Sequence, residues 1–96
     1  MRDAQFEWDD AKATQNLRKH GVPFEAAREA FRDAFAIEWE DDRQGVTEAR
    51  FALLGMVDGR LLYVGFTMRG ERIRIISARG AEPLERRRYH DEDREA

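Results

Sequence analysis

Hydrophobic side chains recur with a helical period in the first third of the chain. Phe24 and Phe31 lie two helical turns apart and mark one buried face, and Pro23 suits the first turn of that helix. An earlier helix is expected from Asp9 or Asp10 to Lys19, because a capping carboxylate precedes it and Gly21 follows it. The pattern therefore predicts two N-terminal helices.

The period changes to that of a β-strand after about residue 34, where Phe35, Ile37 and Trp39 alternate with other side chains. The dipeptide Asp58-Gly59 is a strong signal for a two-residue hairpin turn between two strands. We expect a polar loop over 41–47 and three further strands near 48–57, 60–68 and 71–78.

A last helix is expected from Pro83 to about residue 92, with Leu84 and Tyr89 as its large apolar side chains. Residues Phe6–Trp8 alternate apolar and polar, as either a short strand or an extended lead-in. Short connections between consecutive strands predict a four-stranded antiparallel sheet. We expect one α+β domain over residues 1–96, with two N-terminal helices, this sheet and a C-terminal helix.

Charge is distributed unevenly along this chain, whose net charge is -3. Residues 49–90 carry nine arginines against four acidic side chains, whereas residues 1–48 carry seven basic and twelve acidic side chains. Arginine presents a planar fork that matches phosphate oxygens. The basic segment therefore points to an anionic partner such as nucleic acid, and the alternative is a solvated face with local ion pairs.

The composition offers few metal or nucleophile sites. The chain has no cysteine and two histidines, His20 and His90, so we expect no metal site and no cofactor. Cleavage of RNA without a metal ion needs fewer protein groups, because the substrate supplies its own 2′-hydroxyl as nucleophile. Arginines can then hold the phosphate and stabilise its charge, while a carboxylate, histidine or tyrosine moves protons. The second half of the chain and His20 provide these groups: Arg50, Arg69, Arg74 and Arg79, with Glu48, His20 or Tyr89 as proton carriers.

Each candidate also has a purely structural interpretation. Aromatic residues near the N-terminus are expected in the core rather than as stacking platforms for bases. The structural alternatives are a helix cap for His20, a pair between Glu48 and Arg50, a carboxylate or chain end as partner of Arg79, solvent or Glu82 and Glu85 as partners of Arg86–Arg88, and a helix anchor for Tyr89.

Nearly the whole chain resembles the BrnT toxin family. No single motif carries the resemblance, which rests on an ordered set at family-like spacings. The matching segments are Phe6–Asp9, Lys12, Asn16, Lys19–Val22, Phe24–Ala27, Phe31, Glu48–Arg50, Gly55, Gly59-Arg60, Thr67, Arg69-Gly70, Ile73–Arg79, Glu85–Arg87 and Tyr89.

The resemblance implies a RelE-like fold, metal-independent cleavage of RNA and inhibition of translation. It also implies a small DNA-binding antitoxin of the BrnA type, with which the toxin would repress its own operon. Arg79 is expected to be the most important arginine. From the resemblance and the residues together we expect Arg79, Arg69, Glu48, Arg50 and His20 to be catalytic, and Lys19, Arg74, Thr67 and Tyr89 to bind substrate.

Two other function classes stay open at this point. The chain could bind RNA or an antitoxin without cutting, or it could act only as a transcriptional co-repressor with its partner. We expect a 2:2 complex with the antitoxin and contact with operator DNA through the antitoxin alone. The lack of cysteine, of a long apolar run and of a signal segment predicts a cytoplasmic protein that does not enter a membrane.

Overall fold

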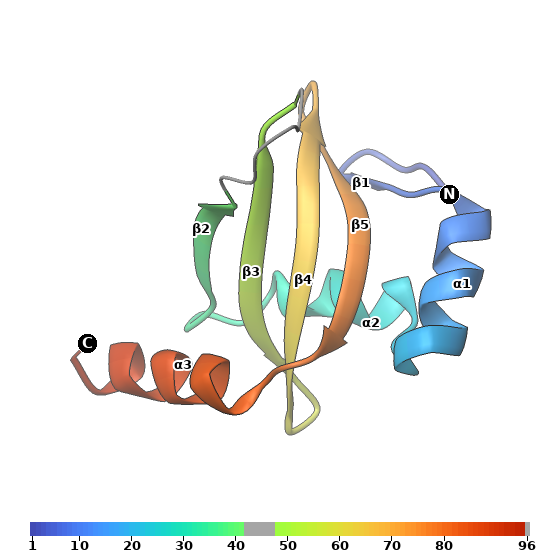
Figure 1. Ribbon diagram of the computed structural model, residues 1–96. Coiled ribbons are helices and arrows are strands. Elements are labelled where there is room, and N and C mark those ends of the chain that lie inside the picture. Colours follow the sequence, from blue (N-terminus) through green and yellow to red (C-terminus); the bar gives the residue numbers. More distant parts are fainter. Residues whose placement is uncertain (42–47, 96) are drawn as a thin grey trace.

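The computed structural model describes residues 1–41 and 48–95 as a sheet with helices on both of its sides (Figure 1). Five strands form one mixed sheet in the order β1-β5-β4-β3-β2. Three helices accompany it, so the expected α+β class is confirmed. The elements are β1 (Phe6–Glu7), α1 (Asp10–His20), α2 (Phe24–Ala30), β2 (Ile37–Asp41), β3 (Arg50–Val57), β4 (Arg60–Arg69), β5 (Arg72–Gly80) and α3 (Pro83–Glu95).

The expectation of four antiparallel strands was wrong in the strand count and in one strand direction. β2 to β5 pair antiparallel, as expected, but β1 adds a fifth strand that runs parallel to β5. Its two residues, Phe6 and Glu7, lie opposite Ile73 and Arg74. So short a segment has no periodicity of its own, and its partner is more than sixty residues away in sequence.

Local signals correctly predicted the ends of α1 and the hairpin turn between β3 and β4. Asp9 caps α1 by accepting a hydrogen bond from the Lys12 backbone N–H, and Gly21 ends the helix in the left-handed conformation. Asp58 and Gly59 have φ of 49° and 80°, the positive values that a two-residue hairpin turn requires. Most of the expected polar loop, residues 42–47, lies outside the described residues, whereas Asp41 closes β2.

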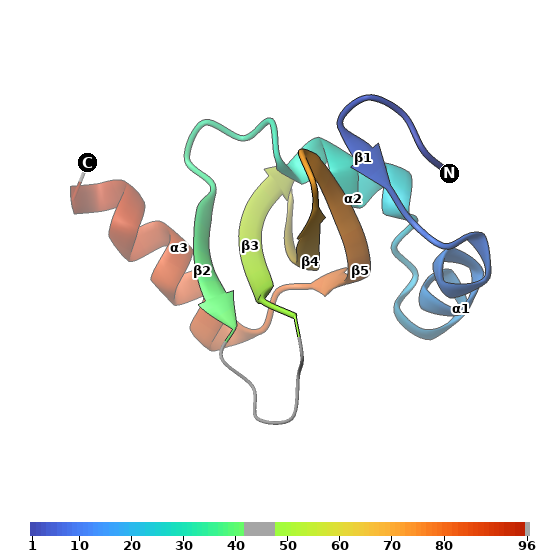
Figure 2. The same cartoon turned by 90° about the horizontal axis from the view of Figure 1, so that it is seen from above.

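The two sides of the sheet are covered by different helices, and Figure 2 shows α2 and α3 on opposite sides. We call the side that faces α1 and α2 the covered face. Gly55 of β3 allows α2 to approach closely, because a Cβ there would overlap the Ala30 carbonyl group. The main core lies between this face and the helices and comprises Phe6, Trp8, Val22, Phe24, Ala27, Ala30, Leu53, Leu62, Val64, Phe66, Ile75 and Ala78.

The other side, which we call the open face, carries a smaller core beneath α3. Leu54, Leu61, Ala81 and Tyr89 are buried there. The Tyr89 hydroxyl donates a hydrogen bond to the Asp33 carboxylate, which also accepts one from the Met56 backbone N–H. α3 thus covers the end of the sheet near the β3–β4 turn, and the remainder of this face carries the side chains described below.

Asn16 fastens α1 to the edge of β5. β1 pairs only with Ile73 and Arg74, so the backbone at Ala78 lies beyond the reach of that strand. The Asn16 amide donates to the carbonyl oxygens of Val22 and Ala78, at 3.0 and 2.8 Å, and accepts from the Ala78 N–H at 3.1 Å. One buried side chain therefore replaces the missing neighbouring strand.

Candidate functional site

The open face contains a hollow whose floor is a row of small residues. Cross-strand pairing places Ala52, Gly65 and Ser77 side by side in β3, β4 and β5. A cavity of about 50 Å³ opens above this row. A Cβ at position 65 would lie 2.8 Å from the Ser77 hydroxyl oxygen, so glycine keeps the hollow open. Its lining comprises Asp41, Arg50, Phe51, Tyr63, Gly65, Phe66, Ile76 and Ser77.

A β-bulge in β5 turns Ser77 toward this hollow. Phe66 pairs with Ile75 but Gly65 pairs with Ser77, so Ile76 is an extra residue in the ladder. Without it, the alternation that points Ile75 inward would also turn Ser77 toward the helices. The bulge therefore reverses the orientation of the rest of the strand.

Arg50 enters the hollow with an unsatisfied donor. Its side chain is half-buried, and its Nε atom is the one buried side-chain nitrogen or oxygen of the described residues that has no hydrogen-bond partner. Asp41 is its cross-strand partner in β2. A guanidinium N–H that has left water without gaining an acceptor favours the binding of an anion.

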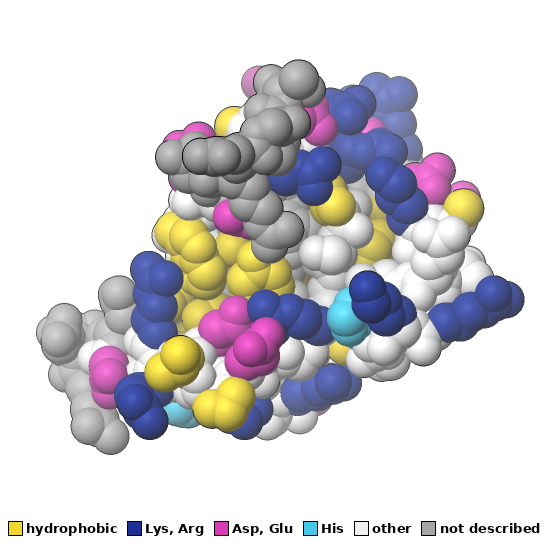
Figure 3. Space-filling view, in the orientation of Figure 1, with side chains coloured by type: hydrophobic (Ala, Val, Ile, Leu, Met, Phe, Trp, Pro, Cys, Tyr) yellow, Lys and Arg dark blue, Asp and Glu magenta, His cyan; other side chains and the backbone are white. Residues whose placement is uncertain are grey.

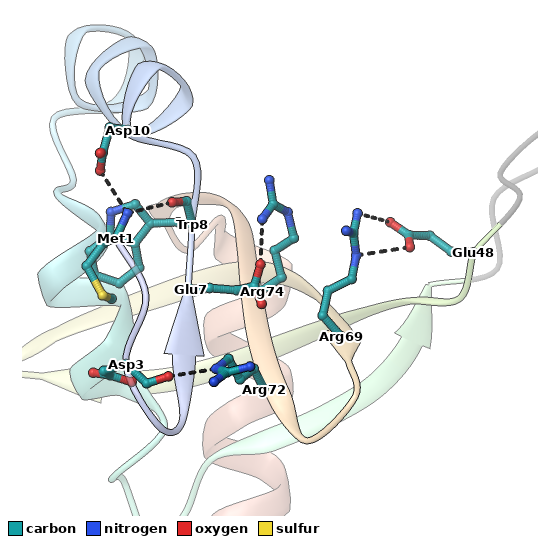
Figure 4. A network of polar contacts seen from close by, with 9 residues as sticks. All are labelled: Met1, Asp3, Glu7, Trp8, Asp10, Glu48, Arg69, Arg72 and Arg74. Atoms are coloured by element: carbon teal, nitrogen blue, oxygen red, sulfur yellow. Dashed lines mark hydrogen bonds and ion pairs between the residues drawn. The ribbon is translucent and has the colours of Figure 1, made fainter.

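Two further arginines of the open face have carboxylate partners (Figure 4). Arg74 donates to Glu7 of β1 at 2.7 Å, and both side chains are largely buried. Arg69 contacts Glu48 at 3.5 Å through two nitrogens, and both of these side chains are about half exposed. The alternative pairing of Glu48 with Arg50 was wrong, because Glu48 contacts Arg69. The looser pair leaves Arg69 more available to a ligand than Arg74.

Arg79 has a strong partner of its own. Its two terminal nitrogens donate to the two oxygens of Glu85 in α3, at 2.8 and 2.9 Å. Its guanidinium also lies over the Tyr63 ring, 4.1 Å from the centroid. The hydrogen bonds to Glu85 raise the pKa of Arg79 above its ordinary value. The structural alternative of a carboxylate partner for Arg79 is therefore confirmed.

Four other predicted site residues lie within the fold or at the end of α1. The Thr67 hydroxyl is buried and donates to the Ala49 carbonyl oxygen at 2.6 Å. Tyr89 of α3 is buried against Leu54 and Leu61 of the sheet, which confirms the anchor interpretation. Lys19 and His20 form the last turn of α1, which packs against β5, with Lys19 exposed and His20 half-buried.

Figure 3 looks onto the open face, where basic side chains surround a hydrophobic patch and an uncharged centre. Five other residues of this face were not predicted from the sequence as site residues: Trp39, Tyr63, Asp41, Gly65 and Ser77. Alternation along β4 could have placed Tyr63 and Gly65 beside Arg69 on one face. The positions of Trp39 and Asp41 depend on strand pairing, and that of Ser77 depends on the bulge.

The described residues contain neither a metal-binding cluster nor a membrane-spanning helix. No three His, Cys, Asp or Glu side chains in this part of the chain gather closely enough to bind a metal ion. Within the same residues no helix is both long enough and apolar enough to cross a membrane.

Comparison with known protein families identifies a match. Residues 8–85 match the family model described as "Ribonuclease toxin, BrnT, of type II toxin-antitoxin system". No curated protein matches the chain. The matched residues extend from the end of β1 into the first turn of α3 and include every strand that lines the hollow.

Proposed function

Since this chain belongs to the BrnT family of ribonuclease toxins of type II toxin–antitoxin systems, we propose that its open face cleaves RNA without a metal ion and thereby inhibits translation. The observation that carries this proposal is Arg50. Its side chain lines a hollow floored by Gly65 and Ser77, and its buried Nε has no hydrogen-bond partner, so a shift of the guanidinium toward the hollow would let a phosphate oxygen accept that hydrogen bond.

The proposed role of each arginine follows from the partner that its side chain has in the fold. Arg50 and Arg69 bind the scissile phosphate, because one has an unused donor and the other has a loose, solvent-exposed ion pair. Arg74 and Arg79 add positive charge while their carboxylates hold them in place. The RNA 2′-hydroxyl attacks the neighbouring phosphorus, and the bond to the 5′ oxygen of the next nucleotide breaks.

Proton transfer is assigned to Glu48 and His20. Glu48 lies half exposed beside Arg69, and His20 lies at the end of α1 next to β5. One group would take the proton of the 2′-hydroxyl and the other would return a proton to the leaving oxygen. Lys19 would add a phosphate contact near His20, whereas Thr67 and Tyr89 would support the site from within the fold.

The test is cleavage of RNA in the presence of EDTA. The parent protein is expected to cut, and Arg50→Ala is expected to reduce the rate at least tenfold, or about 1.4 kcal/mol of transition-state stabilisation. The matched control is Arg32→Ala, which removes an equally positive but exposed side chain from the residues after α2. Circular dichroism of both variants checks the fold.

Three outcomes would count against parts of this proposal. Activity that EDTA abolishes and magnesium restores would refute the metal-free reaction. Equal rates for Arg50→Ala and the parent would remove Arg50 from the mechanism. RNA binding without cleavage, together with normal growth at high soluble expression, would favour the binding-module alternative.

We propose a small, BrnA-like DNA-binding antitoxin as the partner that neutralises the toxin. The arginines of the open face suit an acidic or amphipathic segment of that antitoxin, which would fold as it binds. Dimerisation of the antitoxin would join two toxins in a 2:2 complex that contacts operator DNA through the antitoxin alone. Light scattering on the co-expressed complex tests the stoichiometry, and an association rate that does not change with salt would refute the arginine face as the docking surface.

A further inference from the structure

Two aromatic rings meet on the open face next to the hollow. Trp39 projects from the edge strand β2 and Tyr63 from β4, with the intervening strand β3 between them. Ala52 is the cross-strand partner of Trp39, and its small side chain lets the rings approach above β3. Their centroids are 6.1 Å apart and the ring planes are inclined by 61°. Both side chains are half-buried, so part of each ring reaches the surface.

An arginine guanidinium group lies over each of the two rings. The Arg88 guanidinium of α3 lies 4.3 Å from the Trp39 centroid, and that of Arg79 lies 4.1 Å from the Tyr63 centroid. Arg79 is held by its bidentate pair with Glu85, whereas Arg88 lies on an exposed part of α3. The two rings and two guanidinium groups thus form one continuous aromatic and cationic surface, which we call the platform.

The platform adjoins the proposed phosphate site. Tyr63 belongs to the platform and also lines the hollow that Arg50 enters. Single-stranded RNA is bound by stacking of its unpaired bases on aromatic rings and guanidinium planes, while cations hold its phosphates. These are the groups that the platform and the hollow place next to each other.

We propose that Trp39 and Tyr63 form a stacking site for an unpaired nucleobase of the RNA, next to the nucleotide whose phosphate occupies the hollow. This inference rests on the proposed ribonuclease function and adds the requirement for a single-stranded substrate. The base takes the place of Arg88 on Trp39, because stacking of a base on an aromatic ring is stronger than an exposed cation–π contact. Arg88 then turns to a phosphate of the same strand.

The alternative role for these rings is to anchor α3, since both pack against the core beneath that helix. If Trp39 only anchors α3, its replacement lowers the stability of the protein but leaves the RNA affinity of the folded protein unchanged. If Trp39 stacks on a base, its replacement weakens RNA binding by a protein that is still folded. Binding measured on folded variants therefore separates the two.

Tryptophan fluorescence provides the direct measurement. The chain has two tryptophans, and Trp8 is only 5% exposed within the core of the covered face. A base that stacks on the half-buried Trp39 is expected to quench its emission and leave that of Trp8 unchanged. The probe is a short single-stranded 2′-O-methyl oligoribonucleotide, which cannot be cleaved because its 2′-oxygen carries no proton. Inorganic polyphosphate serves as an anion without bases.

We expect the oligoribonucleotide to quench the emission strongly and polyphosphate to quench it little. Trp39→Leu should abolish the quenching and weaken binding roughly 5- to 100-fold, the range for the loss of one stacked base. Trp39→Phe should restore part of the affinity, because it keeps a smaller ring. Phe35→Leu, which alters an aromatic side chain that is 56% exposed and has no part in the ring and guanidinium contacts of the platform, should bind like the parent.

Equal quenching by polyphosphate, or unchanged affinity in a folded Trp39→Leu variant, would overturn the platform. Because the probe is not cleaved, this result is independent of catalysis. Stacking without any cleavage of ordinary RNA would refute the proposed ribonuclease mechanism and leave the platform standing. Cleavage that does not depend on Trp39 would refute the platform alone.

Discussion

Replacing Asn16 by alanine tests how α1 is held against the edge of β5. The buried amide makes three hydrogen bonds, to the carbonyl oxygens of Val22 and Ala78 and from the Ala78 N–H. A typical hydrogen bond contributes about 1 kcal/mol net, and each buried group left without a partner costs about 1–3 kcal/mol. If water reaches part of the vacated space, the loss in unfolding free energy should be about 3–4 kcal/mol. A domain of this size has about 5–15 kcal/mol in total.

The assay is urea denaturation followed by circular dichroism, with thermal unfolding as a second measurement. The predicted loss corresponds to a decrease in Tm of about 12–30 °C. The matched control is Gln15→Ala, which changes the neighbouring exposed amide on the same helix and should stay within about 0.5 kcal/mol of the parent.

Asn16→Asp tests the direction in which stability changes with pH. A neutral carboxyl can accept from the Ala78 N–H and donate to the Ala78 oxygen, whereas a carboxylate would be buried next to two carbonyl oxygens. Burial raises the pKa of the new carboxyl in the folded state, so the variant should be most stable in acid and lose stability as the pH rises. An Asn16→Ala variant as stable as the parent would refute this account of the α1–β5 contact.

Three shorter predictions concern packing, pH and the hollow. Gly55→Ala should lower the unfolding free energy by about 1–3 kcal/mol, because its Cβ would overlap a carbonyl group of α2. Urea denaturation measures this loss, and an unchanged denaturation midpoint would contradict the prediction. Burial alone raises the pKa of Glu85, but the hydrogen bonds from Arg79 and from the Glu82 backbone N–H, together with the charge of Arg79, outweigh it and hold that pKa below its ordinary value of 4.5. The stability that Glu85 contributes is therefore present above pH 4.5 and lost as the pH falls below it, so Glu85→Gln should flatten the acid side of the pH–stability profile. Gly65→Ala should impair RNA cleavage at least tenfold by filling the hollow, and adding Ser77→Ala should restore part of the rate because it removes the hydroxyl 2.8 Å from the new Cβ.

Local structure could be predicted from the sequence wherever its cause lies within a few residues. Asp9 and Gly21 bound α1 because a capping carboxylate and a left-handed glycine act on adjacent backbone groups. Asp58-Gly59 makes its hairpin for the same reason, and the two-residue alternation along β4 and the first half of β5 agrees with the faces that their side chains take. The arginine-rich half of the chain indicated an anionic ligand before any geometry was known.

The details of the site depended on contacts between distant segments. One extra residue, Ile76, decides which face Ser77 and Arg79 occupy, and no period in the sequence marks a bulge. Arg79 was expected to be the most important arginine, but its bidentate pair with Glu85 gives it a partner, whereas Arg50 has an unused donor.

The edges of the sheet also depend on contacts between distant segments. β1, two residues long, joins β5 because that edge offers unpaired backbone groups, and Asn16 satisfies the part that β1 does not reach. Backbone polar groups that remain unsatisfied once the core has formed determine such pairings. Composition and periodicity describe each segment alone, so they specify the helices, strands and charge of this protein, and only the packed structure determines which arginine keeps a buried donor without a partner.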